Sequence, residues 1–315
     1  MKAAVVNTLG QPPKFEEFAV PTSIDGEALV KVRAAGLHPI VKSITAGAHY
    51  SASGELPVVP GIDGVGVLED GRRVYFGLVR KPWGTMAEFA TAKHANCVPL
   101  PDGIDDATAA AIANPGMSAL VSQKRAGLQA GETVLILGAT GVAGQLAIQT
   151  ARLQGAKRVI AVGRNVEALR GADVDAVVAL GQSEDAIRDA FIEEAAAGID
   201  VVIDYLWGRP TELLLEALAK GFKASATHPT RLVEVGQSAG ANIALPGAVL
   251  RSVDLTILGS GFGAARLDEI FAAVPKLFEA AAKGSLTIDV EKIPLTDVET
   301  AWGRADKGRR IVFTL

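Results

Sequence analysis

Hydrophobic and polar residues follow two different patterns along this chain, and the pattern changes near residue 115. Up to that point, short apolar or alternating stretches are separated by glycine and proline, which is typical of β-strands joined by turns. A helix is expected at 107–113, where an alanine-rich run follows Asp105 and Asp106, because acidic residues are favourable at the positive end of a helix. The expected strands of this first part are 27–34, 60–68, 73–77 and, after a turn, 84–90.

From Gly116 onward, strand-like apolar runs alternate with segments of helical spacing, which is typical of a parallel sheet with crossover helices. The tail returns to a helix at 265–283 and a last strand at 310–313. These patterns predict an α/β protein in which one domain, 116–259, is inserted into a discontinuous, β-rich partner domain, 1–115 and 260–315. The expected strands of the inserted domain are 134–137, 159–162, 176–180, 201–205, 231–236 and 255–259, and its expected helices follow the first strand and occupy 184–196 and 211–219.

A glycine-rich turn, 138–144, joins the first of these strands to the helix that follows it. Such a turn lets the backbone approach a pyrophosphate, and the helix N-terminus adds unpaired N–H groups and the positive end of a dipole. The spacing is G-x-x-G-x-x-G rather than G-x-G-x-x-G, so a plain strand–turn–helix is the alternative interpretation. The second strand at the right distance favours a dinucleotide site in a Rossmann domain with a doubly wound parallel sheet. Its expected cofactor contacts are Thr140, Gly141, Val142 and Ala143.

The end of the second strand indicates which dinucleotide is bound. NAD sites place an acidic residue there for the ribose hydroxyls, whereas NADP sites avoid the carboxylate and offer arginine. Here Gly163, Arg164 and Asn165 follow the strand, and the first acid is Glu167. A guanidinium binds a 2′-phosphate through paired charge-assisted hydrogen bonds. We therefore expect NADPH, with a solvated surface arginine as the alternative for Arg164.

Composition excludes several classes of protein. The net charge of −4 provides no basic surface for nucleic acid, and no uninterrupted apolar stretch reaches the length of a membrane span. The first residues lack the apolar core and cleavage site of a signal peptide. A single cysteine, Cys97, excludes an internal disulfide and any multi-cysteine zinc site. A cytoplasmic enzyme without a nucleic-acid or membrane partner is the expectation.

Five blocks in a fixed order give the chain a resemblance to a known family: 35–39, 60–66, 84–89, 116–119 and 138–144. The chain resembles the zinc-less, quinone oxidoreductase-like branch of the medium-chain dehydrogenases/reductases over essentially its whole length. The resemblance implies a GroES-like β domain that holds the substrate, a Rossmann domain for NADPH, an active site in the cleft between them, and a homodimer or homotetramer.

Zinc-dependent relatives in this superfamily hold a catalytic metal with Cys, His and Cys. The matching positions here are His38, Ile62 and Asn114, and the cysteine-rich structural-zinc segment is also missing. Because isoleucine cannot ligate and asparagine is a poor ligand, we expect no metal. Without a Lewis acid, hydride transfer suits an acceptor that is already electron-poor, such as a quinone or an α,β-unsaturated carbonyl compound.

The resemblance also implies site residues. His38 and Tyr50 are the candidate catalytic residues, as hydrogen-bond or proton donors to the acceptor. A structural histidine bonded to the backbone is the alternative for His38, and an exposed loop pair with His49 is the alternative for Tyr50. Further cofactor contacts are expected from two positions at the nicotinamide and from two loops after strands: Asn114, Ser118, Gly236, Gln237, Ser238, Gly261 and Phe262. Trp207 is interpreted as a packing residue.

Three functions remain open from the sequence. The favoured one is a zinc-independent, NADPH-dependent oxidoreductase that transfers hydride to a quinone or a similar electron-poor carbonyl. An enone or enoyl-thioester reductase is the alternative within the enzymes. A protein that binds NADPH without turnover, as a redox sensor or structural protein, is the alternative from another class.

Overall fold

The computed structural model describes residues 1–52, 54–220, 229–261, 263–305 and 308–315. The chain forms two compact units: Met1–Asn114 with Val274–Leu315 (unit 1), and Pro115–Ala273 (unit 2). The first boundary lies one residue before the expected one, but unit 2 extends beyond the expected end at residue 259. The side chain of Arg125 explains this extension, because its guanidinium donates hydrogen bonds to the carbonyl oxygens of Gly259 (2.8 Å) and Ala264 (2.6 Å).

Unit 2 contains a six-stranded parallel sheet with the strand order β10-β9-β8-β11-β12-β13. The strands are β8 (Thr133–Leu137), β9 (Arg158–Gly163), β10 (Ala176–Ala179), β11 (Val201–Asp204), β12 (Thr230–Glu234) and β13 (Leu255–Gly259). Numbered from β8, this order is 3-2-1-4-5-6, that of a doubly wound dinucleotide-binding sheet. The order reverses between β8 and β11, where such sheets bind ligands beyond the carboxyl ends of the strands.

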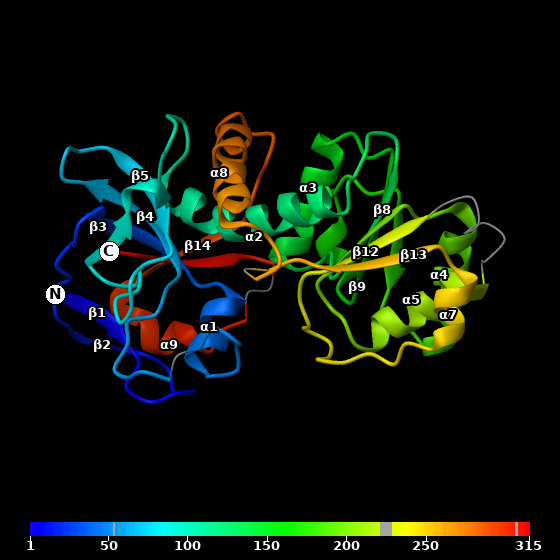
Figure 1. Ribbon diagram of the computed structural model, residues 1–315, viewed down its shortest axis with the longest axis horizontal. Helices are drawn as coiled ribbons and strands as arrows, with labels where there is room; N and C mark the ends of the chain where they lie inside the picture. Colours follow the sequence, from blue (N-terminus) through cyan, green and yellow to red (C-terminus); the bar gives the residue numbers. More distant parts are fainter. Residues whose placement is uncertain (53, 221–228, 262, 306–307) are drawn as a thin grey trace. The chain divides into compact units, whose positions relative to one another are not determined.

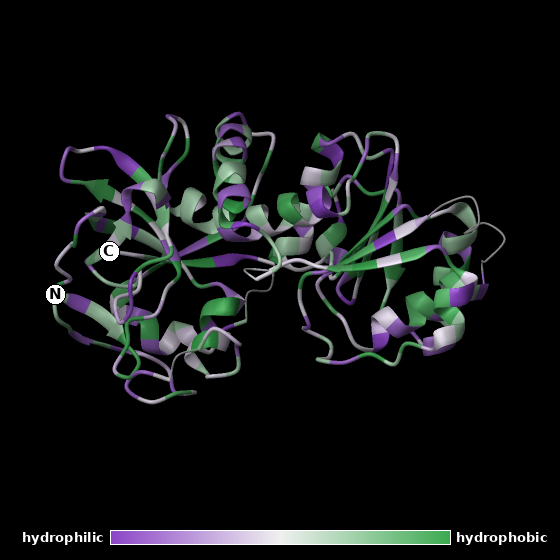
Figure 2. Cartoon of the chain, in the orientation of Figure 1, coloured by the Kyte–Doolittle hydropathy of each residue, from purple (hydrophilic) through white to green (hydrophobic). Residues whose placement is uncertain are grey.

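Both faces of this sheet are buried, which explains why its strands are apolar at successive positions (Figures 1 and 2). Leu135 and Leu137 belong to one apolar cluster, whereas Val134 and Ile136 belong to another. The first cluster includes residues of α4, α5 and α7, and the second includes residues of α2 and α3. The helices are α2 (Asp106–Arg125), α3 (Val142–Leu153), α4 (Glu184–Ala197), α5 (Arg209–Lys220) and α7 (Gly247–Ser252).

Unit 1 contains a seven-stranded sheet and a separate two-stranded one. In the larger sheet β14 pairs with β15 in parallel, and all other pairs are antiparallel. The strand order is β14-β15-β3-β4-β5-β7, and β6 also pairs with β3. The strands are β3 (Glu27–Gly36), β4 (Asp63–Leu68), β5 (Arg73–Gly77), β6 (Phe89–Lys93), β7 (Cys97–Pro99), β14 (Val290–Pro294) and β15 (Arg310–Thr314). The smaller sheet is β1 (Lys2–Val5) with β2 (Lys14–Glu17), and unit 1 also contains the helices α1 (Pro39–Thr45) and α9 (Val298–Trp302). Helix α8 (Leu267–Ala282) begins in unit 2 and ends in unit 1.

The expected α/β class is confirmed, with a doubly wound parallel sheet and a separate, mostly antiparallel one. The expected strands are all found within a few residues of their predicted limits. One helix was predicted too short: 107–113 is the first part of α2, which continues through Pro115 to Arg125. A proline inside a helix costs about 3 kcal/mol, but Ala113 and Met117 on either side are buried, and this burial offsets the cost. None of the helices in the described ranges is long and apolar enough to cross a membrane.

Candidate functional site

The glycine-rich turn of unit 2 is held against the neighbouring strand. The backbone N–H groups of Gly138 and Ala139 both donate to the carbonyl oxygen of Val162 on β9, at 2.9 Å and 3.0 Å. Gly138 has a φ of 87°, a left-handed conformation that favours glycine. Gly141 then caps α3, whose first-turn N–H groups have no partner within the helix. This end of α3 is therefore suited to an anion such as a pyrophosphate.

Two glycines of the turn have different structural roles. A Cβ at Gly144 would overlap the carbonyl oxygen of Gly138 and lie 2.6 Å from the Cα of Ala139. At the exposed Gly141, a Cβ would meet only the Gly138 oxygen, at 3.4 Å, which is an ordinary contact. Gly144 thus lets the helix pack on the turn, whereas Gly141 leaves the outer side of the turn open to a ligand.

The structure brings Thr140, Gly163 and Arg164 together at the end of β9. A Cβ at Gly163 would stand 2.5 Å from the Cγ2 atom of Thr140. The absence of a side chain at Gly163 therefore leaves room for Thr140. Arg164 and Asn165 are exposed, and the Arg164 guanidinium makes no hydrogen bond or ion pair to any described residue. Glu167, the nearest acid in the sequence, pairs with Arg170 at 2.6 Å. The guanidinium of Arg164 is therefore available for an anionic ligand.

Residues 236–238 lie at the same edge of the sheet, after β12. The N–H of Gly236 donates to the carbonyl oxygen of Asp204 (3.2 Å), and the Ser238 hydroxyl donates to that of Tyr205 (2.9 Å). This segment is thus fixed to the end of β11, and Gln237 is exposed within it. The expected loop after β13 is only partly described: the Gly261 carbonyl accepts hydrogen bonds from the N–H groups of Ala264 and Ala265, and Phe262 lies outside the described residues.

Asn114 and Ser118 lie one turn apart on α2, and both are partly buried. The Tyr205 hydroxyl lies beside Ser118 and Ser122, and burial raises the pKa of this phenol well above its ordinary value. Tyr205 therefore stays protonated at neutral pH. Ser118 thus forms a small polar cluster with Ser122 and Tyr205 next to the end of β11, in addition to its expected contact with the cofactor.

Asp204 is a residue that the sequence analysis did not single out. It ends β11 and is fully buried; its Oδ1 atom accepts hydrogen bonds from the N–H groups of Leu206 (2.8 Å) and Trp207 (2.9 Å). Its Oδ2 atom accepts one from the Thr211 hydroxyl at 2.6 Å. Burial raises the pKa of the Asp204 carboxyl, against the lowering effect of these hydrogen bonds. An acidic residue closing an apolar strand is the signal that could have identified this turn.

His38, the first candidate catalytic residue, lies in the interior of unit 1 with 0% of its surface exposed. Its Nε2 atom is 3.2 Å from Oδ1 of Asp63, and the Tyr75 hydroxyl donates to the other carboxylate oxygen at 2.9 Å. A Cβ at Gly36 would lie 2.5 Å from the same Nε2 atom, so the imidazole folds back beneath β3. This placement favours the structural alternative, with a carboxylate rather than the backbone as the partner.

Tyr50, the second candidate, is accessible. Its side chain lies in the loop after α1, is 75% exposed, and has its ring centroid 4.1 Å from that of His49. His49 in turn shares a hydrogen bond of 2.7 Å with the Ser51 hydroxyl, and burial lowers the pKa of its imidazole. Of the two candidates, Tyr50 is the one that a substrate can reach in unit 1.

We expect Asp63→Asn to lower the free energy of unfolding by about 1–3 kcal/mol, because a buried carboxylate that faces His38 and accepts from Tyr75 is replaced by a weaker partner. Urea unfolding measures this change. Asp70→Asn is the control, since its pair with Arg72 is exposed to solvent and such pairs add little to stability. A slower hydride transfer with unchanged stability would instead support the catalytic role of His38.

The described residues contain no group of three or more His, Cys, Asp or Glu side chains placed to hold a metal ion. Ile62 is partly buried among apolar side chains that include Leu37 and Met86. Independence from zinc remains a prediction from the chemistry of His38, Ile62 and Asn114.

Known proteins related to this chain include several quinone reductases. The chain is 28% identical to a protein of Emericella nidulans named probable NADPH-dependent quinone reductase, over 99% of both chains. It is 35% identical to the quinone oxidoreductase of Pongo abelii over 50% of this chain, and the match spans about half (51%) of that relative. A 2-methylene-furan-3-one reductase of Solanum lycopersicum is 28% identical over 51% of this chain and 46% of its own. No protein-family model matches the chain.

The fold has close counterparts among solved structures. The quinone oxidoreductase of Thermus thermophilus, described together with its NADPH complex, has a TM-score of 0.79 and 28% identity and covers 100% of both chains. The expected resemblance is therefore confirmed: the chain is related over its whole length to quinone oxidoreductases and has the fold of the medium-chain dehydrogenases/reductases.

Proposed function

We propose that this protein is a zinc-independent oxidoreductase that transfers a hydride from NADPH to a quinone or a similar electron-poor carbonyl compound. The class, an NADPH-dependent oxidoreductase, rests on the full-length Emericella relative and on the Thermus structure with its NADPH complex. The observation that carries the proposal is the open end of α3 together with Arg164 at the end of β9, whose guanidinium has no partner among the described residues. In this proposal unit 2 binds the cofactor, and unit 1 provides the substrate site.

The residues of unit 2 fit the two anionic parts of NADPH. The N–H groups of Val142 and Ala143 at the start of α3 would bind the pyrophosphate, with Gly141 leaving room for it and Thr140 beside it. Arg164 would pair with the 2′-phosphate, with Gly163 and Asn165 next to it, and a carboxylate is absent from these positions. When bound, NADPH supplies the hydride, and the remaining expected contacts at 114, 118, 236–238, 261 and 262 would hold its nicotinamide end.

The protein then has to align the acceptor and provide a proton. A quinone that accepts a hydride carries a delocalised negative charge, which needs a proton or hydrogen bonds but no Lewis acid. We assign the proton to the exposed Tyr50 hydroxyl or to water, and we assign His38 to positioning through its buried pair with Asp63. The product is the hydroquinone, formed by addition of one hydride and one proton.

A second candidate function is the reduction of an activated C=C bond. The relative from Solanum lycopersicum is named a 2-methylene-furan-3-one reductase, and its similarity to this chain supports this alternative. The cofactor site would be the same, and only the acceptor would differ.

Oxidation of NADPH, followed by its absorbance at 340 nm, distinguishes these functions. The acceptors are naphthoquinone, phenanthrenequinone, an enal, an enone and a crotonyl thioester, with NADH in parallel. Turnover of the quinones supports the proposal, and faster turnover of the alkenes assigns the chain to the second function. NADPH binding without any turnover would overturn both and leave a cofactor-binding protein such as a redox sensor.

Removal of metal ions tests the zinc-independent chemistry. We expect dialysis against EDTA to leave the rate of quinone reduction unchanged, because Ile62 and Asn114 cannot complete a catalytic zinc site with His38. The same assay at 340 nm measures the rate before and after chelation. A loss of rate that Zn²⁺ restores would contradict this expectation.

A further inference from the structure

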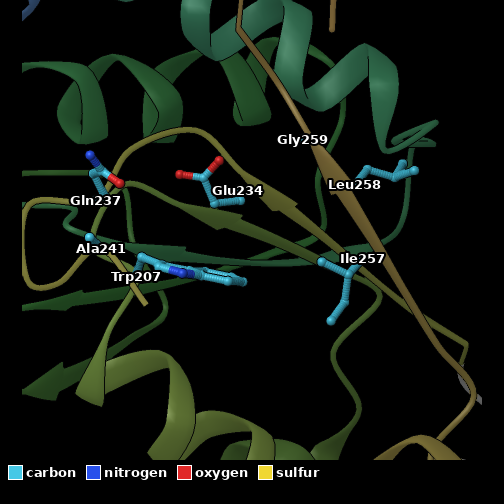
Figure 3. Close-up of a pocket in the computed structure, with 7 residues that line it drawn as sticks. All are labelled: Trp207, Glu234, Gln237, Ala241, Ile257, Leu258 and Gly259. Atoms are coloured by element: carbon cyan, nitrogen blue, oxygen red, sulfur yellow. The ribbon is translucent and has the colours of Figure 1, made fainter. Parts of the chain in front are cut away.

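A cavity lies in unit 2 at the carboxyl ends of β12 and β13. It has a volume of about 320 Å³, at the lower end of the range for small-molecule sites, and it is open to solvent. Figure 3 shows its lining side chains, among them Trp207, Glu234, Gln237 and Ile257. The expected anion contacts of the cofactor lie elsewhere, at the ends of β8 and β9, and β11 stands between the two places in the sheet.

Trp207 reaches this cavity through a strained turn. Its φ of 53° is a left-handed conformation that non-glycine residues rarely adopt, and such residues are concentrated at functional sites. The buried Asp204 carboxylate maintains the turn, because it accepts the N–H of Trp207 at 2.9 Å. Gly208, with a φ of 64°, packs so closely that a Cβ would lie 2.9 Å from the carbonyl oxygen of Ala239. The contacts of Asp204 and Gly208 thus fix the turn, and the turn places the indole of Trp207 at the cavity.

Glu234 provides a negative charge without a counter-ion. Its carboxylate is half-buried and makes no hydrogen bond or ion pair to the described residues. Asp204 is its register partner on β11, so the two side chains emerge on the same face of the sheet. Burial, and then the charge of Asp204, raise the pKa of Glu234. An incoming cation would neutralise a charge that the described part of the chain leaves unpaired.

The other polar groups of the lining are also available. The side chains of Gln237 and Trp207 have no hydrogen bond to the described part of the chain, and in Figure 3 Gln237 and Glu234 lie on the same side of the indole ring. An aromatic face beside a carboxylate selects for a cation, because the ring quadrupole and the negative charge both favour it. The amide oxygen of Gln237 can accept a further N–H.

We propose that this cavity binds a compact organic cation, a planar amidinium or a ring bearing a protonated amine. The carboxylate of Glu234 would accept its N–H groups in a charge-assisted pair, and the indole of Trp207 would cover its flat face. This site goes beyond the hydride-transfer function. It shares Gln237 with the expected cofactor contacts, but the two groups that would recognise the cation, Glu234 and Trp207, are not among those contacts.

Benzamidine is the probe, and neutral benzamide, which has nearly the same shape, is its matched control. Both are titrated into the full-length protein by calorimetry, with and without saturating NADPH. We expect benzamidine to bind at least about tenfold more tightly than benzamide, the effect of one charge-assisted pair, and to bind equally well when NADPH is present. Equal affinity for the two compounds would overturn the proposal. So would displacement of benzamidine by NADPH, which would assign the cavity to the cofactor, since Gln237 is also an expected cofactor contact.

A pair of glutamate variants locates the bound cation. Glu234→Gln keeps the shape of the side chain and is expected to remove the tenfold preference for benzamidine over benzamide. Glu193→Gln is the control, because Glu193 is exposed on α4, away from the cavity lining, and the same charge is removed. An unchanged preference in Glu234→Gln, or an equal loss in both variants, would overturn the assignment. The comparison of the two compounds on the unaltered protein does not depend on how either variant folds.

Discussion

Gly144→Ala is expected to lower NADPH affinity by on the order of 100-fold, because a shifted turn would lose charge-assisted hydrogen bonds from the start of α3 to the pyrophosphate. The new Cβ would overlap the Gly138 carbonyl oxygen and stand 2.6 Å from the Cα of Ala139. Both are backbone atoms, so no side chain can move aside, and the turn itself has to shift away from α3. We expect the free energy of unfolding to fall by about 1–3 kcal/mol, the usual cost of overpacking. Fluorescence titration with NADPH and urea unfolding measure the two effects.

Gly141→Ala separates the two roles of glycine in the same turn. Its Cβ would make only an ordinary contact with Gly138 at 3.4 Å, and its φ of −81° suits any residue, so stability should be unchanged. NADPH affinity should nevertheless fall, because the methyl group would occupy the exposed side where the pyrophosphate is expected. An equal loss of stability in both variants would show that the distinction is wrong, and normal NADPH binding by Gly144→Ala would remove the cofactor role of the turn.

Arg164→Ala is expected to weaken NADPH binding by about 10- to 100-fold, the equivalent of roughly 1.5–3 kcal/mol for hydrogen bonds between charged groups. NADH affinity should stay the same, since NADH has no 2′-phosphate. The free energy of unfolding should not change either, because the guanidinium has no partner among the described residues. Dissociation constants for both cofactors, measured with the same protein, give the selectivity directly.

Arg170→Ala is the matched control for this prediction. Arg170 lies in the same segment and is also exposed, but it pairs with Glu167 at 2.6 Å. Removing it changes the net charge equally, so a general electrostatic effect on the anionic cofactor would appear in both variants. Equal losses of NADPH and NADH affinity in Arg164→Ala would contradict its assigned role.

The fold of unit 2 could be predicted well from the sequence, and the reason is local. The central strands β8, β9 and β11 are buried on both faces, so each appears as a continuous apolar run, and the helices follow the strands within a short distance. The limits of α2 could not be predicted in this way. Pro115 and Gly116 normally end a helix, and only burial of the residues around them explains why the helix continues to Arg125.

In the candidate site, too, the features set by neighbouring residues could be predicted, and those set by packing could not. The glycine-rich turn and its link to β9 could be predicted, because the β-α-β unit is contained in one short stretch of chain. The partner of His38 could not, because His38 follows β3 whereas Asp63 begins β4, and the pair forms only when these two strands pack together. A histidine in a family position therefore indicated catalysis, whereas its burial favours a structural role.

By itself, the sequence predicted the class of fold, the place of the glycine-rich turn and the residue expected to select the cofactor, since all three depend on residues close together in the chain. The tertiary structure alone decided which side chains meet across strands: Thr140 above Gly163, His38 against Asp63, and Trp207 beside Glu234. Each of these contacts joins segments whose register is set by packing and sheet pairing, and periodicity along one segment carries no information about its neighbour.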